Sequence, residues 1–305
     1  MVSPLAVIDR VDNFTYGSTD NCYLLVAHTD NVALGYIHPT LVDHLRAHPG
    51  FTSSGRSISI NASYDTLEKR NQLFEQFALE LKSKPELHQL VAKGWRNELY
   101  TVYNPTHTPY FQVERAVSVL LGVVTYGVHI NGYIPENKSS NGKLKFWIPR
   151  RSATKPTFPS MLDNTVAGGL GYPHGIWETV VKECDEEAGL PQKFVEENAK
   201  STGVLTYIYQ TPDGGIQPEV EYIYDIVFPN ETEVIPVPQD GEAQDFTLMD
   251  IDEVEQRLQA DEFKPNCGMV IIDFLIRHGY ITPENEQFYS EILARTHRRL
   301  PFPTK

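Results

Sequence analysis

The sequence predicts an α+β protein made of an N-terminal mixed α/β domain over residues 1–112 and a second domain with a mixed sheet over residues 113–305. The chain has 305 residues, 41% of them hydrophobic, so it can bury a sizeable core, and its length favours two domains. Strand-like and helix-like patterns occur in both halves of the chain. The boundary is placed near residue 113 because long β-rich runs begin there.

The first domain is expected to combine a β-hairpin with helices. Residues 22–27 and 32–37 are apolar runs on either side of a turn-forming stretch, which is typical of a hairpin. A helix should follow over residues 40–47. A second helix is predicted between Asp65 and Pro85, because Asp65 begins a capping-box spacing and apolar residues then recur at helical intervals.

The second domain is expected to contain a sheet followed by helices. Alternating and β-branched residues predict strands over residues 113–132, 143–152, 204–209 and 220–228. The last two strands are separated by a Gly214-Gly215 turn. The tail has helical periodicity over residues 252–260 and 268–278.

Composition limits the partners of the protein. A formal net charge of −14 argues against a nucleic-acid-binding surface, which needs clustered Lys and Arg. We expect no membrane span and a cytosolic location, because no apolar run approaches about 20 residues and the first residues do not resemble a transit peptide. Cys22, Cys184 and Cys267 lie far apart, so neither a disulfide framework nor a zinc knuckle is indicated. The sequence does not determine the oligomeric state.

The most informative segment is a glycine-rich loop that leads into a helix. Residues Gly168–Gly175 allow backbone N–H groups to approach a ligand, with Gly168 and Gly169 as substrate-binding candidates. The helix is expected to begin near Ile176 and to end at Gly189. A helical wheel places one apolar arc beside a second arc that carries glutamates.

The glutamates of this helix are Glu183, Glu186 and Glu187, and all are expected to be exposed. Carboxylates so close together raise each other's pKa unless a cation lies among them. Mg²⁺, or alternatively Mn²⁺, would meet that need and would also bridge to substrate phosphates. An ordinary solvated acidic face is the competing interpretation. The glycine loop before the helix and the glycine after it favour the metal site for a small-molecule diphosphate.

The segment resembles a Nudix box, whose pattern is G-x5-E-x7-R-E-x-x-E-E-x-G. The matching positions are Gly168, Glu183, Glu186, Glu187 and Gly189. Two positions depart from the pattern, because His174 replaces the first Glu and Lys182 replaces the Arg. Lys182 can pair with a helix carboxylate without the bidentate grip of Arg. His174 is either a surface loop residue or itself a ligand or base.

The resemblance extends over nearly the whole chain and is narrower than the superfamily. The chain looks like the thiamine pyrophosphokinase-related Nudix proteins in residues 94–100, 114–133, 150–170, 173–190, 239–254, 263–280 and 297–303. The resemblance implies a family-specific N-terminal domain followed by a Nudix α/β/α sandwich with a mixed sheet. It also implies a Mg²⁺-dependent hydrolase that removes the terminal phosphate from thiamine diphosphate or, preferentially, from its damaged oxo and oxy forms, giving the monophosphate.

Further residues are candidates for the same chemistry. Glu242 lies where Nudix enzymes often supply a base or an extra metal ligand, although a solvated loop acid is equally compatible with its position. Arg150, Arg151 and Lys155 form a basic cluster before the box that could bind diphosphate oxygens, the alternative being a solvated basic patch. The helical wheel puts Trp177 on the packing face, so it is expected in the core rather than against a ligand ring.

Two other functions remain open. Another Nudix activity, such as pyrophosphohydrolysis of a nucleoside-diphosphate derivative, would use the same metals and a different pocket. A non-catalytic sensor of a diphosphate ligand is suggested by His174 and Lys182, whereas the retained glutamates argue against it.

Overall fold

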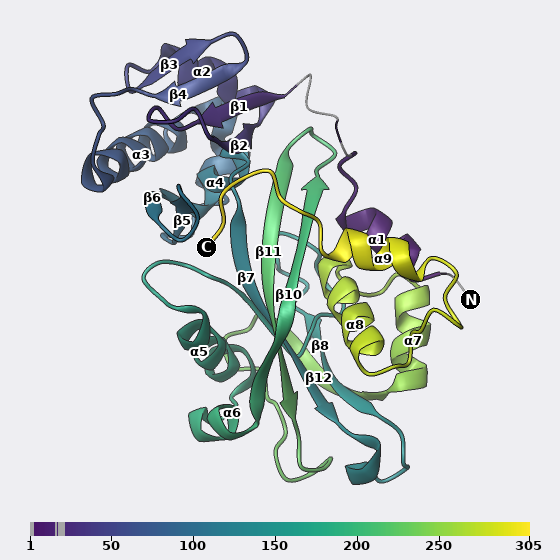
Figure 1. Cartoon of the computed structure of the whole chain (residues 1–305). Helices are drawn as coiled ribbons and strands as arrows, with labels where there is room; N and C mark the ends of the chain where they lie inside the picture. Colours follow the sequence, from purple (N-terminus) through teal and green to yellow (C-terminus); the bar gives the residue numbers. More distant parts are fainter. Residues whose placement is uncertain (1–2, 16, 18–21) are drawn as a thin grey trace.

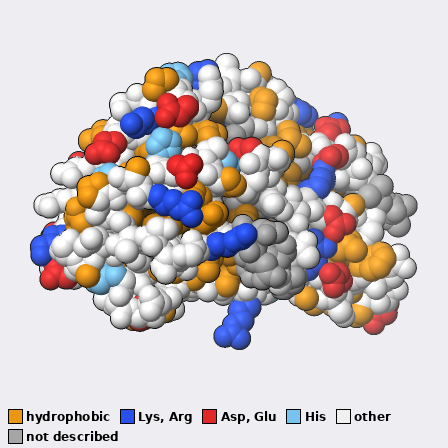
Figure 2. All heavy atoms as spheres, turned by 90° about the horizontal axis from the view of Figure 1, so that it is seen from above, with side chains coloured by type: hydrophobic (Ala, Val, Ile, Leu, Met, Phe, Trp, Pro, Cys, Tyr) orange, Lys and Arg blue, Asp and Glu red, His pale blue; other side chains and the backbone are white. Residues whose placement is uncertain are grey.

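The computed structural model describes residues 3–15, 17 and 22–305, and it confirms the predicted α+β class (Figure 1). A smaller sheet with its own helices comes first in the chain, and a six-stranded sheet covered by helices follows. On the face seen in Figure 2, acidic and basic side chains are interspersed with hydrophobic ones. In the described part of the chain, no helix is both long enough and apolar enough to cross a bilayer.

The first sheet has the strand order β2-β1-β4-β3. Its strands are β1 (Tyr23–Val26), β2 (Ala33–Ile37), β3 (Phe51–Ser54) and β4 (Ser57–Ile60). The β1–β2 and β3–β4 pairs are antiparallel and the β1–β4 pair is parallel, so the predicted hairpin is confirmed within a mixed sheet. A separate antiparallel pair follows, formed by β5 (Leu99–Tyr103) and β6 (Pro109–Glu114).

Helices cover this first sheet. They are α2 (Val42–Ala47), α3 (Leu67–Lys82) and α4 (Arg115–Leu121), with short helical turns at Pro39–Leu41, Pro85–Leu87 and His88–Ala92. The long predicted helix is therefore present, but its cap is Thr66 rather than Asp65. The Thr66 side chain accepts a hydrogen bond from the Lys69 backbone N–H, while Asp65 forms an ion pair with the Lys69 ammonium.

The prediction of strands over residues 113–132 is wrong for residues 115–121, which are helical. Strand β6 ends at Glu114, helix α4 follows, and the next strand is β7 (Thr125–Ile134). The run can form a helix because Ala116, Val117, Leu120 and Leu121 bury one side of it against the first core. Gly122 then ends the helix with a φ of +60°, and a Cβ there would lie 2.0 Å from the Tyr36 carbonyl oxygen.

The second sheet has the order β10-β11-β7-β8-β12, with β9 paired to β7. Its remaining strands are β8 (Lys145–Arg151), β9 (Val166–Gly169), β10 (Ala199–Gln210), β11 (Ile216–Val227) and β12 (Ala243–Asp250). The β11–β7 pair is parallel and the other pairs are antiparallel, so the sheet is mixed. The predicted Gly214-Gly215 turn joins β10 to β11.

Helices lie on both faces of this sheet, which makes an α/β/α sandwich (Figure 1). One face carries α5 (Ile176–Ala188) and α6 (Gln192–Asn198), and a short turn at Glu136–Lys138 lies between β7 and β8. The other face carries α1 (Leu5–Val11), α7 (Ile251–Gln259), α8 (Pro265–Arg277) and α9 (Tyr289–Thr296).

The N-terminal helix α1 packs against the second sheet layer rather than the first. It contacts α8, α9 and β10. The buried carboxylate of Asp12, just after α1, accepts a hydrogen bond of 2.8 Å from Arg298 near the C-terminus. The two ends of the chain are therefore joined, and the division of the chain at residue 113 stays a prediction.

Candidate active site

Helix α5 begins and ends where the sequence predicts, for local reasons. The Glu178 carboxylate accepts a hydrogen bond of 2.9 Å from the Gly175 backbone N–H at the start of the helix. Gly189 ends the helix with a φ of +61°, which an L side chain would adopt only with strain. The helix therefore has a fixed register against β9, and this register positions its glutamates.

Glu183 lies against the glycines of β9. A Cβ on Gly168 would be 2.4 Å from the Glu183 Cδ, so only glycine leaves room for this carboxylate. The Glu183 side chain is 15% exposed, whereas that of Glu186 is 51% exposed. The prediction that all three glutamates are exposed is thus wrong for Glu183, and Glu187 is also partly buried. These two residues face the sheet because α5 packs on β9.

Glu187 is held by a backbone group of the same strand. Its carboxylate accepts a hydrogen bond of 3.0 Å from the Ala167 N–H. Burial raises the pKa of Glu187 well above its usual range, and the nearby carboxylates of Asp163, Glu183 and Glu242 raise it further. Burial also raises the pKa of Glu183. The site therefore gathers acidic groups that disfavour one another's ionisation.

Lys182 occupies the position of the Arg in the box pattern and pairs with two carboxylates. Its Nζ lies 3.0 Å from Glu183 Oε1 and 2.7 Å from Glu186 Oε2. Burial alone would lower the pKa of Lys182, but these two carboxylates raise it. Lys182 is therefore a charged group that fixes two of the helix glutamates.

Glu242 lies on the loop before β12, on the other side of the acidic cluster. It forms an ion pair with Lys155, and its backbone carbonyl accepts a hydrogen bond of 2.8 Å from the Ser152 N–H. Glu242 raises the pKa of both Glu183 and Glu187, so it lies near them although it is distant in sequence. A small cavity lined by Asp163, Glu187 and Glu242 separates the loop from the helix.

Arg150 and Arg151 are engaged with the loop that precedes β9. Arg151 donates to Asp163 at 2.6 Å and to the Phe158 and Thr157 carbonyls at 3.0 and 3.1 Å. Arg150 donates to the Ser160 carbonyl at 2.8 Å. These bonds use most of the directed donors of Arg151, so it fixes the loop. That either arginine binds phosphate stays a prediction.

His174 is exposed, and its backbone N–H donates to the Gly171 carbonyl in a tight turn of the box loop. It lines a groove between this loop and the first domain, together with Tyr103, Tyr126 and Tyr172. Trp177 is 38% exposed, and its ring centroid lies 5.8 Å from that of Tyr224. The expectation that Trp177 lies in the core is therefore wrong, because α5 leaves its first turn at the edge of the sheet.

Sequence reasoning did not identify two residues of the first domain, Glu98 and Tyr100, that lie against the box loop. It also missed Arg115 at the start of α4, which is hydrogen-bonded to Glu98. A Cβ on Gly169 would lie 2.3 Å from the Tyr100 hydroxyl oxygen. The sequence pointed to this region only indirectly, because residues 94–100 are one of the stretches that carry the family resemblance. The fold then shows that this stretch lies on the box loop.

The donor set fits Mg²⁺ or Mn²⁺ by its chemistry. It consists of carboxylate oxygens, and for Glu183 and Glu187 burial and the neighbouring carboxylates raise the pKa, so a cation would relieve that repulsion. Within residues 3–15, 17 and 22–305 there is no group of three or more His, Cys, Asp or Glu side chains arranged to hold a metal ion. The assignment of Glu183, Glu186 and Glu187 as metal ligands therefore stays a prediction.

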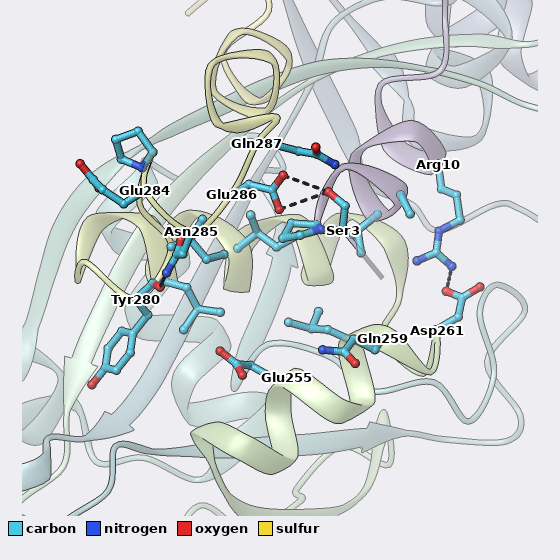
Figure 3. Close-up of a pocket in the computed structure, with 18 residues that line it drawn as sticks. Ser3, Arg10, Glu255, Gln259, Asp261, Tyr280, Glu284, Asn285, Glu286 and Gln287 are labelled. Carbon is cyan, nitrogen blue, oxygen red and sulfur yellow. Dashed lines mark hydrogen bonds and ion pairs between the residues drawn. The ribbon is translucent and has the colours of Figure 1, made fainter. Parts of the chain in front are cut away.

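A large cavity of the described residues lies elsewhere. It is bounded by α1, α7, α8 and the loop over residues 280–287 (Figure 3). The Ser3 hydroxyl donates to the Glu286 carboxylate at 3.2 Å beside the cavity, and Arg10 pairs with Asp261 at one end of it. None of the residues of the box segment lines it. Size alone therefore does not locate the chemistry in this protein.

Comparison with known proteins identifies the family. Residues 6–125 match a family described as a domain of unknown function, DUF4743, and residues 137–267 match the NUDIX domain. The chain is 41% identical to the uncharacterized protein YJR142W of Saccharomyces cerevisiae, over 98% of this chain and 92% of that protein. It is 35% identical to the chloroplastic Nudix hydrolase 20 of Arabidopsis thaliana, over 87% of this chain and 71% of that protein.

Among the solved structures that the chain matches is the bifunctional NMN adenylyltransferase/ADP ribose pyrophosphatase of Francisella tularensis. It has 13% sequence identity and a TM-score of 0.40, covering 71% of this chain and 51% of that chain. The glycine loop and the glutamate helix lie within residues 137–267, which match the NUDIX domain. The chain belongs to the Nudix hydrolase family.

Proposed function

We propose that this protein is a divalent-metal-dependent hydrolase that removes the terminal phosphate from thiamine diphosphate or, preferentially, from its oxo and oxy forms, giving the monophosphate. Membership of the Nudix hydrolase family supports hydrolysis of a diphosphate bond. The observation that carries the assignment of the site is the packing of Glu183 against Gly168, with Glu187 and Glu242 close by. The thiamine substrate is supported by the resemblance outside the box.

Each residue of the site has a proposed role. Glu183, Glu186 and Glu187 would hold Mg²⁺, or alternatively Mn²⁺. When bound, the cation polarises the diphosphate and lowers the pKa of a water molecule. Glu242 accepts a proton from that water or adds a further ligand. Lys182 orients Glu183 and Glu186 through its two hydrogen bonds.

The substrate is proposed to lie over the box loop. Lys155 is next to Glu242 and can bind a phosphate oxygen if this ion pair opens. The backbone at Gly168 and Gly169 has no side chain that would obstruct close approach of a phosphate. The groove beside His174 is lined by tyrosines, which provide flat apolar surfaces for a heteroaromatic ring. We propose a cytosolic location as well, as the composition suggests.

A panel of substrates tests this function. Phosphate release is measured with Mg²⁺ on thiamine diphosphate, its oxo and oxy forms, and nucleoside diphosphate derivatives. The proposal predicts the highest kcat/KM on a thiamine form. Activity confined to nucleoside diphosphate derivatives would contradict the thiamine assignment and support the other Nudix activity.

A non-catalytic sensor is the second candidate, and one contact favours it. Lys182 pairs with Glu183 and Glu186, so it partly neutralises the acidic face without a metal. Titration calorimetry with Mg²⁺ in the presence of a diphosphate separates the two functions. The hydrolase is expected to bind Mg²⁺, and absence of metal binding would support the sensor.

A further inference from the structure

We propose that Arg115, the first residue of α4, binds the diphosphate of the substrate, and that Glu98 and Tyr100 of the first domain position it over the box loop. The inference deepens the proposed diphosphate hydrolysis and rests on it. It makes the N-terminal domain a part of the active site rather than an appended module. Contacts between β5, the start of α4 and the glycines of the box loop bring these residues together.

Strand β5 lies directly on the box loop. The Tyr172 backbone N–H donates to the Leu99 carbonyl at 2.8 Å, which joins the loop to the strand. On each side of this bond a side chain of the first domain lies over a loop glycine. The Tyr100 hydroxyl would be 2.3 Å from a Cβ on Gly169, and Glu98 Oε1 would be 2.8 Å from a Cβ on Gly171. Because these two positions are glycines, the side chains of Tyr100 and Glu98 can lie directly against the box loop.

Glu98 also fixes the arginine. Its second oxygen, Oε2, accepts a hydrogen bond of 2.9 Å from Arg115 Nη1. The Arg115 guanidinium carbon lies 5.7 Å from the centroid of the Tyr100 ring, so the carboxylate and the ring define its orientation. The Arg115 side chain is 45% exposed, and this bond is the one hydrogen bond that its guanidinium forms with the part of the chain that the structure describes. Its other N–H donors remain available to a ligand.

The charges around Arg115 suit a metal-bound diphosphate. Burial alone would lower the pKa of the Arg115 guanidinium, yet nearby acidic groups, Glu98 and Glu242 among them, raise it. The geometry agrees, because Glu98, which is bonded to Arg115, lies against Gly169, and Glu183 of α5 lies against the adjacent Gly168. A diphosphate needs a cation on some of its oxygens and directed donors on the others. The acidic cluster would supply the first and Arg115 the second.

The predicted basic cluster is a weaker source of such donors. Arg151 already donates to Asp163 and to two loop carbonyls, and Arg150 donates to a third carbonyl. Lys155 is paired with Glu242. Arg115, by contrast, is partly exposed and lies near the acidic cluster, and Glu98 and Tyr100 fix the orientation of its guanidinium.

Calorimetry with inorganic pyrophosphate and Mg²⁺ tests the proposal on the full chain, because this probe requires neither turnover nor a thiamine ring. Arg115→Gln is expected to weaken pyrophosphate binding by about 10-fold to 100-fold, the effect of losing charge-assisted hydrogen bonds. Arg115→Lys, which keeps the charge without the planar fork, should bind with intermediate affinity. The matched control is Arg46→Gln, which removes a partly exposed arginine of α2 in the first domain.

The positioning role of Glu98 has its own readout. Glu98→Gln should raise KM for the diphosphate substrate several-fold with little change in kcat, whereas a purely structural ion pair would alter the melting temperature and leave KM unchanged. Pyrophosphate binding by Arg115→Gln within twofold of the wild type would overturn the proposal, as would wild-type protein that binds no pyrophosphate. Intact Arg115-dependent binding without activity on thiamine forms would contradict the substrate assignment alone.

Discussion

The side chain of Glu183 lies against the α-carbon of Gly168, so that a methyl group at this glycine would be 2.4 Å from the Glu183 Cδ. Gly168→Ala should therefore displace the carboxylate and lower kcat/KM by roughly 100-fold, as expected for a misplaced catalytic group. The matched control is Gly203→Ala, where an added Cβ meets nothing within 4 Å. Steady-state kinetics checks both variants. Equal activity in the two would show that the position of Glu183 does not matter.

Glu187 is expected to contribute to activity at the expense of stability. Its pKa is raised above the ordinary value of 4.5, so the folded protein holds a proton that the unfolded chain releases. Stability without metal should therefore fall as the pH rises above about 4.5. Glu187→Gln removes this titration, so in EDTA its melting temperature should exceed that of the wild type by a few degrees at pH 8. Its phosphate release should be lost.

This comparison has an internal control in Glu186, which is exposed on the same helix. No comparable gain of stability is expected for Glu186→Gln, because its carboxylate is hydrated. Thermal melts of both variants at pH 5 and pH 8 check the difference. A melting temperature of Glu187→Gln below that of the wild type at pH 8 would contradict the burial of this charge.

Lys182 is expected to hold Glu183 ionised. Burial raises the pKa of Glu183, and the hydrogen bond from Lys182 opposes that rise. Lys182→Met should therefore raise the pKa of Glu183 further and move the acidic limb of the pH–activity profile to higher pH. Lys182→Arg restores the residue of the box pattern and should keep the limb in place. The profile of kcat/KM between pH 5 and pH 9 is the measurement, and identical acidic limbs in Met and Arg variants would refute this role.

Asp163 is expected to stabilise the fold through Arg151. Burial alone would raise the pKa of Asp163, but Lys264 and Arg151 lower it to about 2. Its contribution to stability is therefore present above pH 3.8, its ordinary pKa, and is lost as the pH falls toward 2. Asp163→Asn should cost roughly 3 kcal/mol at neutral pH, the usual effect of breaking a buried ion pair.

Urea unfolding of Asp163→Asn at pH 7 and pH 3 checks this contribution. The difference from the wild type should shrink at the lower pH. Arg150→Gln is the control, because Arg150 contacts the neighbouring Ser160 carbonyl and is more exposed than Arg151. Unfolding free energies of Asp163→Asn and the wild type that agree at both pH values would contradict the role of the pair.

Local sequence patterns predicted a helix or strand well where residues within or next to that element determine its conformation. Helix α5 begins and ends as expected because Glu178 caps Gly175 and Gly189 adopts a positive φ. The prediction for residues 113–132 failed in part because β-branched residues occur both in strands and in buried helices. Its burial against the first core, and not its local propensity, decides that α4 forms.

The candidate site was predictable only where it is contiguous. The box residues follow from spacing along one loop and one helix. The nearness of Glu242 to Glu187, and of Tyr100 to Gly169, depends on how distant strands pack, which no local pattern encodes. The partial burial of Glu183 and Glu187 was missed for the same reason. A helical wheel gives the relative directions of side chains on α5, but it does not show that β9 packs against the side that carries these two glutamates.

The most direct test of the central claim is phosphate release by the double variant Glu186→Gln, Glu187→Gln, measured with Mg²⁺ on the best thiamine diphosphate form. Activity at the background level is expected in a protein that remains folded, because the metal would lose two of its proposed carboxylate ligands. Activity of the double variant equal to that of the wild type would contradict the assignment of the α5 glutamates as the metal site.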